Sequence, residues 1–356
     1  MLARYPAKDN KPLFNVKTMK MMIKRTLTLL STALLAQLAS AELPTLLPVF
    51  HHQGVVLDYQ SLKYNPCDDI IIPSVVRTDH FQKALGKYYM YYAPHNAPGG
   101  ICMAYADTLQ GPWKEYDSNP LIGRDWAPHY KVSHVSGPHA IWIEEEHKLF
   151  LYYHGENPIT RFASSTDGIH FKYEGVALTP NDFENVSEVS YARIFRHAIP
   201  GKENRYIMLL MGNNAGTRKI YLAWSKDGRT WATQRTPFMS PEKKTGQLAQ
   251  AWLLPWQGKL YLVYHDYDPK GTDLHISEVD PEFTKTRYLG IFYDHTSAGP
   301  DNTAQMSPCI MEDDNKLYLF TNIGPRLHQK IALAIAEGSR KTQQNVSGDA
   351  SKPTQP

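Results

Sequence analysis

Side chains suited to sugar chemistry recur at the ends of apolar, β-rich segments of this sequence. One set lies at the start of such segments: Asp68, Asp69, Ser136, His139, Glu188, Tyr191, Arg193, Gln250 and Gln305. A second set follows the next segments: His95, His154, Asn213, His265 and Asn322. Imidazole, phenol and carboxyl groups serve as general acids and bases, and Tyr rings pack against pyranose faces. We therefore expect a carbohydrate site.

Glycoside hydrolysis is the first chemistry that these residues could perform. Two carboxyl groups flank the scissile bond in that reaction, one as acid and one as base or nucleophile. We assign Asp69 as the base and Glu188 as the acid, with His139 and His154 orienting sugar hydroxyls. We interpret the neighbouring Asp68 as a substrate contact or a replacement for Asp69. The substrate would be an oligo- or polysaccharide.

β-Elimination from a uronic-acid glycan is the alternative chemistry. It needs groups that neutralise the carboxylate, a base for the α-proton and an acid for the leaving oxygen. The side chains that could supply these are His134, His139, His154, Tyr191 and Arg193. Arg161 and Arg218 could bind a sugar carboxylate or sulfate. A non-catalytic carbohydrate-binding protein is the third possibility, because neither reaction is specified by a complete motif.

The remaining polar residues of the two sets are interpreted as substrate contacts. The full group of expected substrate-binding residues is Asp68, His95, His134, Arg161, Arg193, Asn213, Gln250, His265 and Gln305. Tyr191 joins Asp69, Glu188, His139 and His154 as an expected catalytic residue. No spacing of ligands supports a metal site or a cofactor.

An internal repeat predicts the elements that position these residues. A short apolar segment, a turn with a basic residue and an aromatic-rich segment recur about every 53 to 65 residues. The turns are Gly86-Lys87, His147-Lys148, Asn204-Arg205, Gly258-Lys259 and Asn315-Lys316. Each unit continues into further β-rich segments, so four antiparallel strands per unit and a five-bladed β-propeller are predicted. A two-domain β-sandwich is the alternative.

The last unit lacks a fourth strand, because it stops after residues 330–337. We expect the N-terminal segment at residues 54–58 to supply that strand and close the ring. In antiparallel blades the starts of the first strands and the ends of the second strands lie on one face. We therefore expect His139, His154 and Tyr191 to converge in one axial pocket.

The segments PSVVR, GKYYMYYA and MAYADTLQGPW, from Pro73 to Trp113, resemble the first blade of five-bladed propeller glycosidases such as glycoside hydrolase family 43. The resemblance covers about residues 54–337 and implies the fold and a glycosidase activity. The carboxylate pattern of that family is not preserved. Ile72 stands where the family has an Asp before the first Pro, and Gly137-Pro138-His139 replaces an Ala-Pro-Asp motif.

The two ends of the sequence differ in composition from residues 42–337, which form the expected propeller domain. Lys20, Lys24 and Arg25 precede an apolar run and a small-x-small site ending at Ala41. This pattern predicts a signal peptide over residues 1–41, with Met19 as an alternative start, and a secreted or periplasmic monomer. Residues 338–356 predict a disordered tail.

Charge and motif content exclude several classes of function. The formal charge of +3 comes mainly from cations before residue 42, so we expect no nucleic-acid partner. Beyond the leader no apolar run is long enough to span a membrane, so we expect no membrane association after cleavage. The three cysteines show no zinc-binding or redox spacing.

Overall fold

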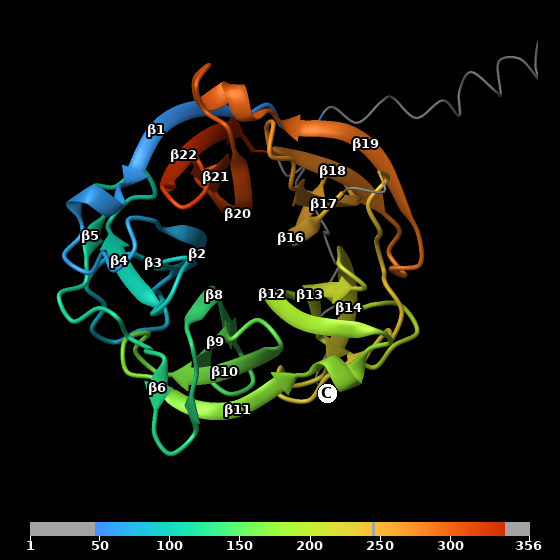
Figure 1. Ribbon diagram of the computed structural model, residues 1–356, viewed down its shortest axis with the longest axis horizontal. Helices are drawn as coiled ribbons and strands as arrows, with labels where there is room; N and C mark the ends of the chain where they lie inside the picture. Colours follow the sequence, from blue (N-terminus) through green and yellow to red (C-terminus); the bar gives the residue numbers. More distant parts are fainter. Residues whose placement is uncertain (1–46, 244–245, 339–356) are drawn as a thin grey trace, which may run out of the picture. The chain divides into compact units, whose positions relative to one another are not determined.

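The computed structural model describes residues 47–243 and 246–338, which form five antiparallel sheets around a central axis (Figure 1). Each sheet has four strands, so the predicted five-bladed propeller is confirmed. The predicted signal peptide and residues 339–356 of the predicted tail lie outside the described residues. No helix in the described ranges has the length and apolar character needed to cross a membrane.

The strands of each blade follow one another from the axis outward. Blade I contains β2 (Ile71–Arg77), β3 (Tyr88–Ala93), β4 (Cys102–Ala106) and β5 (Lys114–Glu115). Blade II contains β8 (Val135–Ile143), β9 (Lys148–Gly155), β10 (Ile159–Ser165) and β11 (Lys172–Leu178). Blade III contains β12 (Val186–Arg196), β13 (Tyr206–Asn214), β14 (Thr217–Ser225) and β15 (Ala232–Thr233).

Blades IV and V complete the ring. Blade IV contains β16 (Leu248–Trp256), β17 (Lys259–Asp266), β18 (Asp273–Val279) and β19 (Thr286–Tyr293). Blade V contains β20 (Gln305–Asp313), β21 (Lys316–Ile323), β22 (Lys330–Glu337) and β1 (His51–Leu57). The short elements between them are the hairpin strands β6 (Asp125–Trp126) and β7 (Tyr130–Lys131) and the 3₁₀ turns η1 (Tyr59–Ser61), η2 (Pro180–Asp182) and η3 (His295–Ala298).

The N-terminal strand closes the last blade, as the missing fourth strand predicts. β1 pairs antiparallel with β22, from His51 opposite Ile335 to Leu57 opposite Ile331. Figure 1 shows the blue β1 strand beside the red strands of blade V. Closure removes the exposed sheet edge that an incomplete blade would leave.

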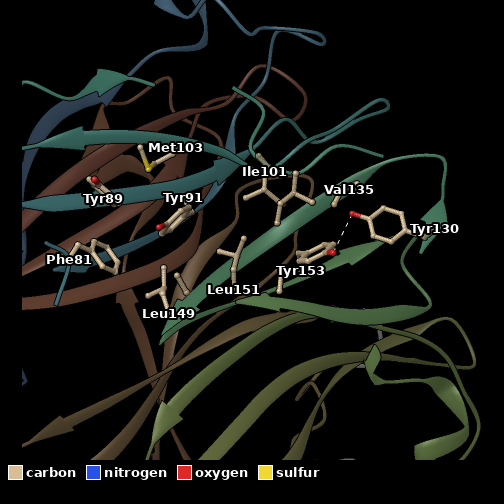
Figure 2. Packing of buried hydrophobic residues seen from close by; sticks show 14 residues of the cluster. Phe81, Tyr89, Tyr91, Ile101, Met103, Tyr130, Val135, Leu149, Leu151 and Tyr153 are labelled. Carbon is tan, nitrogen blue, oxygen red and sulfur yellow. Dashed lines mark hydrogen bonds between the residues drawn. The ribbon is translucent and has the colours of Figure 1, made fainter. Parts of the chain in front are cut away.

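Tight turns and buried aromatic strands explain why the repeated segments form blades. Gln257-Gly258 and Asp314-Asn315 each have two consecutive residues with positive φ, the conformation of two-residue hairpin loops. All six residues of β3 are buried, because neighbouring blades cover both faces of the sheet. Figure 2 shows the core between blades I and II, where Tyr153 donates a hydrogen bond to the Tyr130 hydroxyl over 3.3 Å.

Each innermost strand carries a β-bulge near its start, and the bulge is the feature that positions the site. The pairing of β2, β8, β12, β16 and β20 with the next strand skips residues at this point. The bulge residues with positive φ are Ile72, Gly137, Tyr191, Gln250 and Ser307. Left-handed backbone is rare for non-Gly residues and is most costly for β-branched ones such as Ile72. A bulge re-aims a side chain relative to a regular strand, so five re-aimed residues surround the axis.

Candidate functional site

A polar cavity of about 510 Å³ lies where the innermost strands β2, β12, β16 and β20 begin. The residues named from the sequence that line it are His95, Tyr191, Asn213, Arg218, Gln250, His265 and Asn322. The other polar lining residues are Gln247, Tyr267, Ser307 and Arg326, with Ile71, Gly216, Ala249 and Met306 as further contacts. We call this cavity the axial pocket.

Of the five bulge residues with positive φ, Tyr191 is the one with a titratable side chain. Its φ is 53° and it is buried. The His154 ring meets the Tyr191 ring edge-on, with centroids 4.8 Å apart. Burial raises the pKa of Tyr191, the charges of Arg218 and Arg326 oppose that rise, and Glu188 adds to it. The phenol is therefore neutral at rest, and the charges of two arginines and one glutamate act on it.

Asp69 reaches the axial pocket through His95. Asp69 is fully buried, and its Oδ1 atom accepts a hydrogen bond of 2.6 Å from the backbone N–H of Gln329. Its Oδ2 atom lies 3.4 Å from Nδ1 of His95, which lines the pocket. A carboxylate hydrogen-bonded to one imidazole nitrogen orients the ring and leaves the other nitrogen available for proton transfer. Within the described residues neither Oδ2 of Asp69 nor Nδ1 of His95 has a hydrogen-bond partner, so Asp69 is the carboxylate next to His95 but does not hydrogen-bond to it.

Glu188 also lies beside the pocket rather than in its lining. It is partly exposed on β12, three residues before Tyr191. Its Oε2 atom is buried and has no hydrogen-bond partner within the described residues. Buried polar atoms normally have a partner, so this oxygen keeps an unused capacity to accept a proton or a hydrogen bond.

Two buried histidines beside the axis are held neutral. Burial lowers the pKa of His265 to about 3, and Arg218 contributes to that shift. Burial also holds the pKa of His154 well below its usual value, and the neighbouring His134 and His95 add to that shift. Neutral imidazoles can orient hydroxyl groups of a ligand but carry no charge to it.

His139 and Arg193 meet each other rather than Tyr191. Arg193 is almost fully buried, and its Nη1 atom lies 3.4 Å from Nδ1 of His139. Arg193 also donates to the carbonyl oxygens of Pro73 and Pro138 and to Oε1 of Gln250. His139 contacts the backbone carbonyl of Ile194 through Nε2, and burial lowers the pKa of His139 to about 3. This pair joins blades I to IV, outside the lining of the axial pocket.

Of the three residues expected to converge in the axial pocket, Tyr191 lines it, His154 contacts Tyr191 but is not a lining residue, and His139 lies with Arg193. Gly137 lies in the bulge between Ser136, which is opposite His154, and His139, which is opposite Tyr152. A Cβ atom at Gly137 would lie 2.6 Å from the His154 ring, so it is this glycine, not His139, that faces His154.

Four other expected substrate contacts lie outside the lining. Asp68 is exposed and accepts a hydrogen bond from Asn65. His134 contacts Asn157 and lies edge-on to His154. Arg161 is buried in an ion pair with Glu156, at 2.9 Å. Gln305 is fully buried and accepts a hydrogen bond from Thr321.

Four polar lining residues were missed by sequence reasoning, namely Gln247, Tyr267, Ser307 and Arg326. Tyr267 directly follows β17, as His95 follows β3 by two residues, so the rule of strand exits could have found it. Arg326 lies in the loop between β21 and β22. Nothing in its sequence context distinguishes that loop from any other surface turn.

A second cavity, of about 500 Å³, lies beside blade IV and shares Tyr267 with the axial pocket. Its lining includes Glu242, Asp266, Asp268 and Asp273. Asp273, Asp294 and His295 have ligand atoms within 4.8 Å of one another, a spacing that could hold a cation. These carboxylates already accept hydrogen bonds from His295 and from the backbone of η3.

No protein-family model and no curated protein matches the sequence. Solved structures do match in fold. The structure of BT0996 in an RGII complex aligns with a TM-score of 0.61 at 13% identity, over 82% of this protein and 93% of the other. A glycosyl hydrolase from Bacteroides ovatus aligns with a TM-score of 0.60 at 11% identity, over 83% of this protein and 95% of the other.

The catalytic domain of the Coprinopsis cinerea GH62 alpha-L-arabinofuranosidase gives a TM-score of 0.58 at 11% identity, over 81% of this protein and 96% of the other. At such identities the likeness concerns the fold. The protein therefore has the five-bladed propeller fold found in glycoside hydrolases, as its repeats predict.

Proposed function

We propose that the protein is a carbohydrate-active enzyme that hydrolyses a glycosidic bond of an oligo- or polysaccharide bound in the axial pocket. The observation that carries this proposal is the position of Tyr191, which lines a polar cavity together with Arg218 and Arg326 and packs against the His154 ring. The cavity volume falls in the range of about 300–1,000 Å³ typical of small-ligand sites. Its wall offers hydroxyl, amide and imidazole groups to sugar hydroxyls.

Hydrolysis requires a group that protonates the leaving oxygen and one that attacks the anomeric carbon or activates water. Although most glycosidases use two carboxyl groups, a Tyr nucleophile is a known alternative. We assign attack to Tyr191, with Glu188 accepting its phenol proton. We assign protonation of the leaving oxygen to His95, with Asp69 beside it. The predicted pair Asp69 and Glu188 would thus act through His95 and Tyr191, and water would then release the sugar from Tyr191.

β-Elimination is a second candidate, and one observation favours it. None of the described residues that line the axial pocket is an Asp or a Glu, whereas Arg218 and Arg326 are present. In this reaction His95 or Tyr191 would remove the α-proton of a uronic acid. The carbon–oxygen bond to the leaving sugar would break, and its oxygen would take a proton from the other group.

The experiment that tests both reactions is incubation of the purified protein with a panel of plant and algal glycans, followed by mass analysis of the products. Hydrolysis gives products that have gained water, and elimination gives products with a conjugated double bond that absorbs ultraviolet light. Binding without either product would support a non-catalytic carbohydrate-binding protein instead. The predicted leader supports the further proposal that this activity is secreted or periplasmic. That the protein acts as a monomer stays a separate proposal.

A further inference from the structure

The fixed charges in the lining of the axial pocket have one sign. Arg218 comes from β14 and Arg326 from the loop between β21 and β22, so blades III and V each contribute one guanidinium. The described lining residues include no carboxylate. Asp69 and Glu188 lie behind His95 and Tyr191, as described above. A concave wall with charges of one sign concentrates ligands of the opposite charge.

Neither guanidinium is neutralised by the protein. Within residues 47–243 and 246–338, Arg218 and Arg326 form no ion pair with an acidic side chain. The guanidinium carbon of Arg218 lies 6.0 Å from the centre of the Tyr191 ring. Arg161, in contrast, is buried against Glu156. The two pocket arginines therefore keep their charge and their hydrogen-bond donors for a ligand, close to the phenol to which we assign the reaction.

The neighbouring cavity carries the opposite charge. It shares Tyr267 with the axial pocket, and its acidic lining residues are Glu242, Asp266, Asp268 and Asp273, against the single lysine Lys243. A negatively charged group would be repelled there and attracted to the axial pocket. A glycan that extended over both cavities would therefore bind with its negatively charged unit in the axial pocket.

We propose that the axial pocket selects a sugar unit that carries a negative charge, a carboxylate or a sulfate, and that Arg218 and Arg326 are the residues that select it. The inference deepens the proposed function, because it names the substrate class of the same site. Guanidinium groups bind such oxyanions through two parallel hydrogen bonds. Neutral sugars gain nothing from these two side chains beyond ordinary hydrogen bonds.

The test is a set of binding titrations with matched pairs of oligosaccharides. Galacturonan and glucuronan oligomers are compared with their methyl esters, and sulfated galactan oligomers with their desulfated forms. We expect at least about tenfold tighter binding of the charged member in one pair, with affinity falling as salt is raised. A difference in affinity within the uronan pairs would identify a carboxylate as the recognised group, and a difference within the galactan pair would identify a sulfate.

Two variants and a matched control assign the effect to the pocket. Arg218→Gln and Arg326→Gln should each weaken binding of the charged oligomer about tenfold more than binding of its neutral partner. Arg235→Gln removes the same charge from an exposed arginine that lies outside the pocket and is paired with Glu184, and it should change neither affinity. Thermal unfolding checks that all three variants fold.

The inference fails if both members of every pair bind equally, if no oligomer binds to the folded protein, or if Arg235→Gln weakens binding as much as the pocket variants do. These results are separable from a failure of the proposed function. Charge-dependent binding without any cleavage would reject the enzyme and keep the inference. Cleavage of neutral glycans that is unaffected by Arg218→Gln and Arg326→Gln would reject the inference alone.

Discussion

The ring of His154 on β9 packs edge-on against the ring of Tyr191 on β12, with centroids 4.8 Å apart. The two residues belong to different blades and meet because Tyr191 occupies a bulge and His154 ends the second strand of the preceding blade. The Nδ1 atom of His154 has no hydrogen-bond partner within the described residues. A neutral imidazole in this position can restrain the Tyr191 ring.

Gly137 should be essential to this pairing. An added Cβ would lie 2.6 Å from both Cε1 and Nδ1 of His154, so Gly137→Ala must displace the imidazole or the strand. Gly258→Ala is the matched control, because Gly258 has a similar positive φ but open space around it. We expect both variants to lose about 1 kcal/mol of unfolding free energy from backbone strain.

Only Gly137→Ala should also lower kcat, by about tenfold or more, because it moves a group in contact with Tyr191. Urea unfolding and steady-state kinetics of the two variants measure these effects. Equal kcat values in both variants would show that the position of His154 does not matter to the reaction.

Asp69→Asn should reduce turnover without unfolding the protein. The Asn carbonyl can still accept the hydrogen bond from the backbone of Gln329, but it no longer presents a carboxylate to His95. We expect kcat to fall by about 10²-fold, in the range typical of general acid–base catalysis, and KM to change little. Asp68→Asn alters an exposed carboxylate next to it and serves as the control. An unchanged kcat in Asp69→Asn would remove Asp69 and His95 from the mechanism.

The folded protein should lose stability in mild acid because of its buried histidines. Burial lowers the pKa values of His139 and His265 to about 3, whereas an unfolded His titrates near 6.5. Below about pH 6.5 the unfolded chain therefore binds more protons than the folded one. Below about pH 6.5 the free energy of unfolding should therefore decrease as the pH is lowered. The decrease is as much as about 1.4 kcal/mol per pH unit for each such histidine.

His265→Asn tests this assignment, since the Asn carbonyl can still accept the hydrogen bond that the backbone N–H of Ser307 donates to Nδ1. We expect the stability lost between about pH 7 and pH 5 to shrink by about 1–2 kcal/mol relative to the unmodified protein. The exposed His51 on β1 provides a control in His51→Asn. Identical pH slopes for the protein and the His265 variant, measured by urea unfolding, would contradict the linkage.

The ring of five blades could be predicted from the sequence because each blade is determined by turns and strands that are close together in the sequence. Turn pairs such as Gly258-Lys259 lie between apolar segments at the same place in each unit, and a unit without a fourth strand requires one from elsewhere. β1 supplies that strand, beginning at His51, three residues before the predicted segment. Hairpins and strand closure depend on residues that are near in sequence or on the count of strands.

The site was less predictable because its geometry depends on bulges and on distant contacts. Ile72, Tyr191 and Gln250 have left-handed backbone, which nothing in their residue types suggests. The burial of Asp69 depends on Gln329, which is 260 positions away. Likewise Arg326 reaches the pocket only because blade V closes beside blade I.

The central claim is that Tyr191 performs chemistry in the axial pocket, and the kinetics of Tyr191→Phe test it most directly. The substitution keeps the ring packed against His154 and removes only the hydroxyl group. Tyr173→Phe, which removes a hydroxyl from the outer strand β11, is the control. We predict a loss of at least about 10²-fold in kcat for Tyr191→Phe, with substrate binding retained and no loss for Tyr173→Phe. Turnover of Tyr191→Phe equal to that of the unmodified protein would contradict the account.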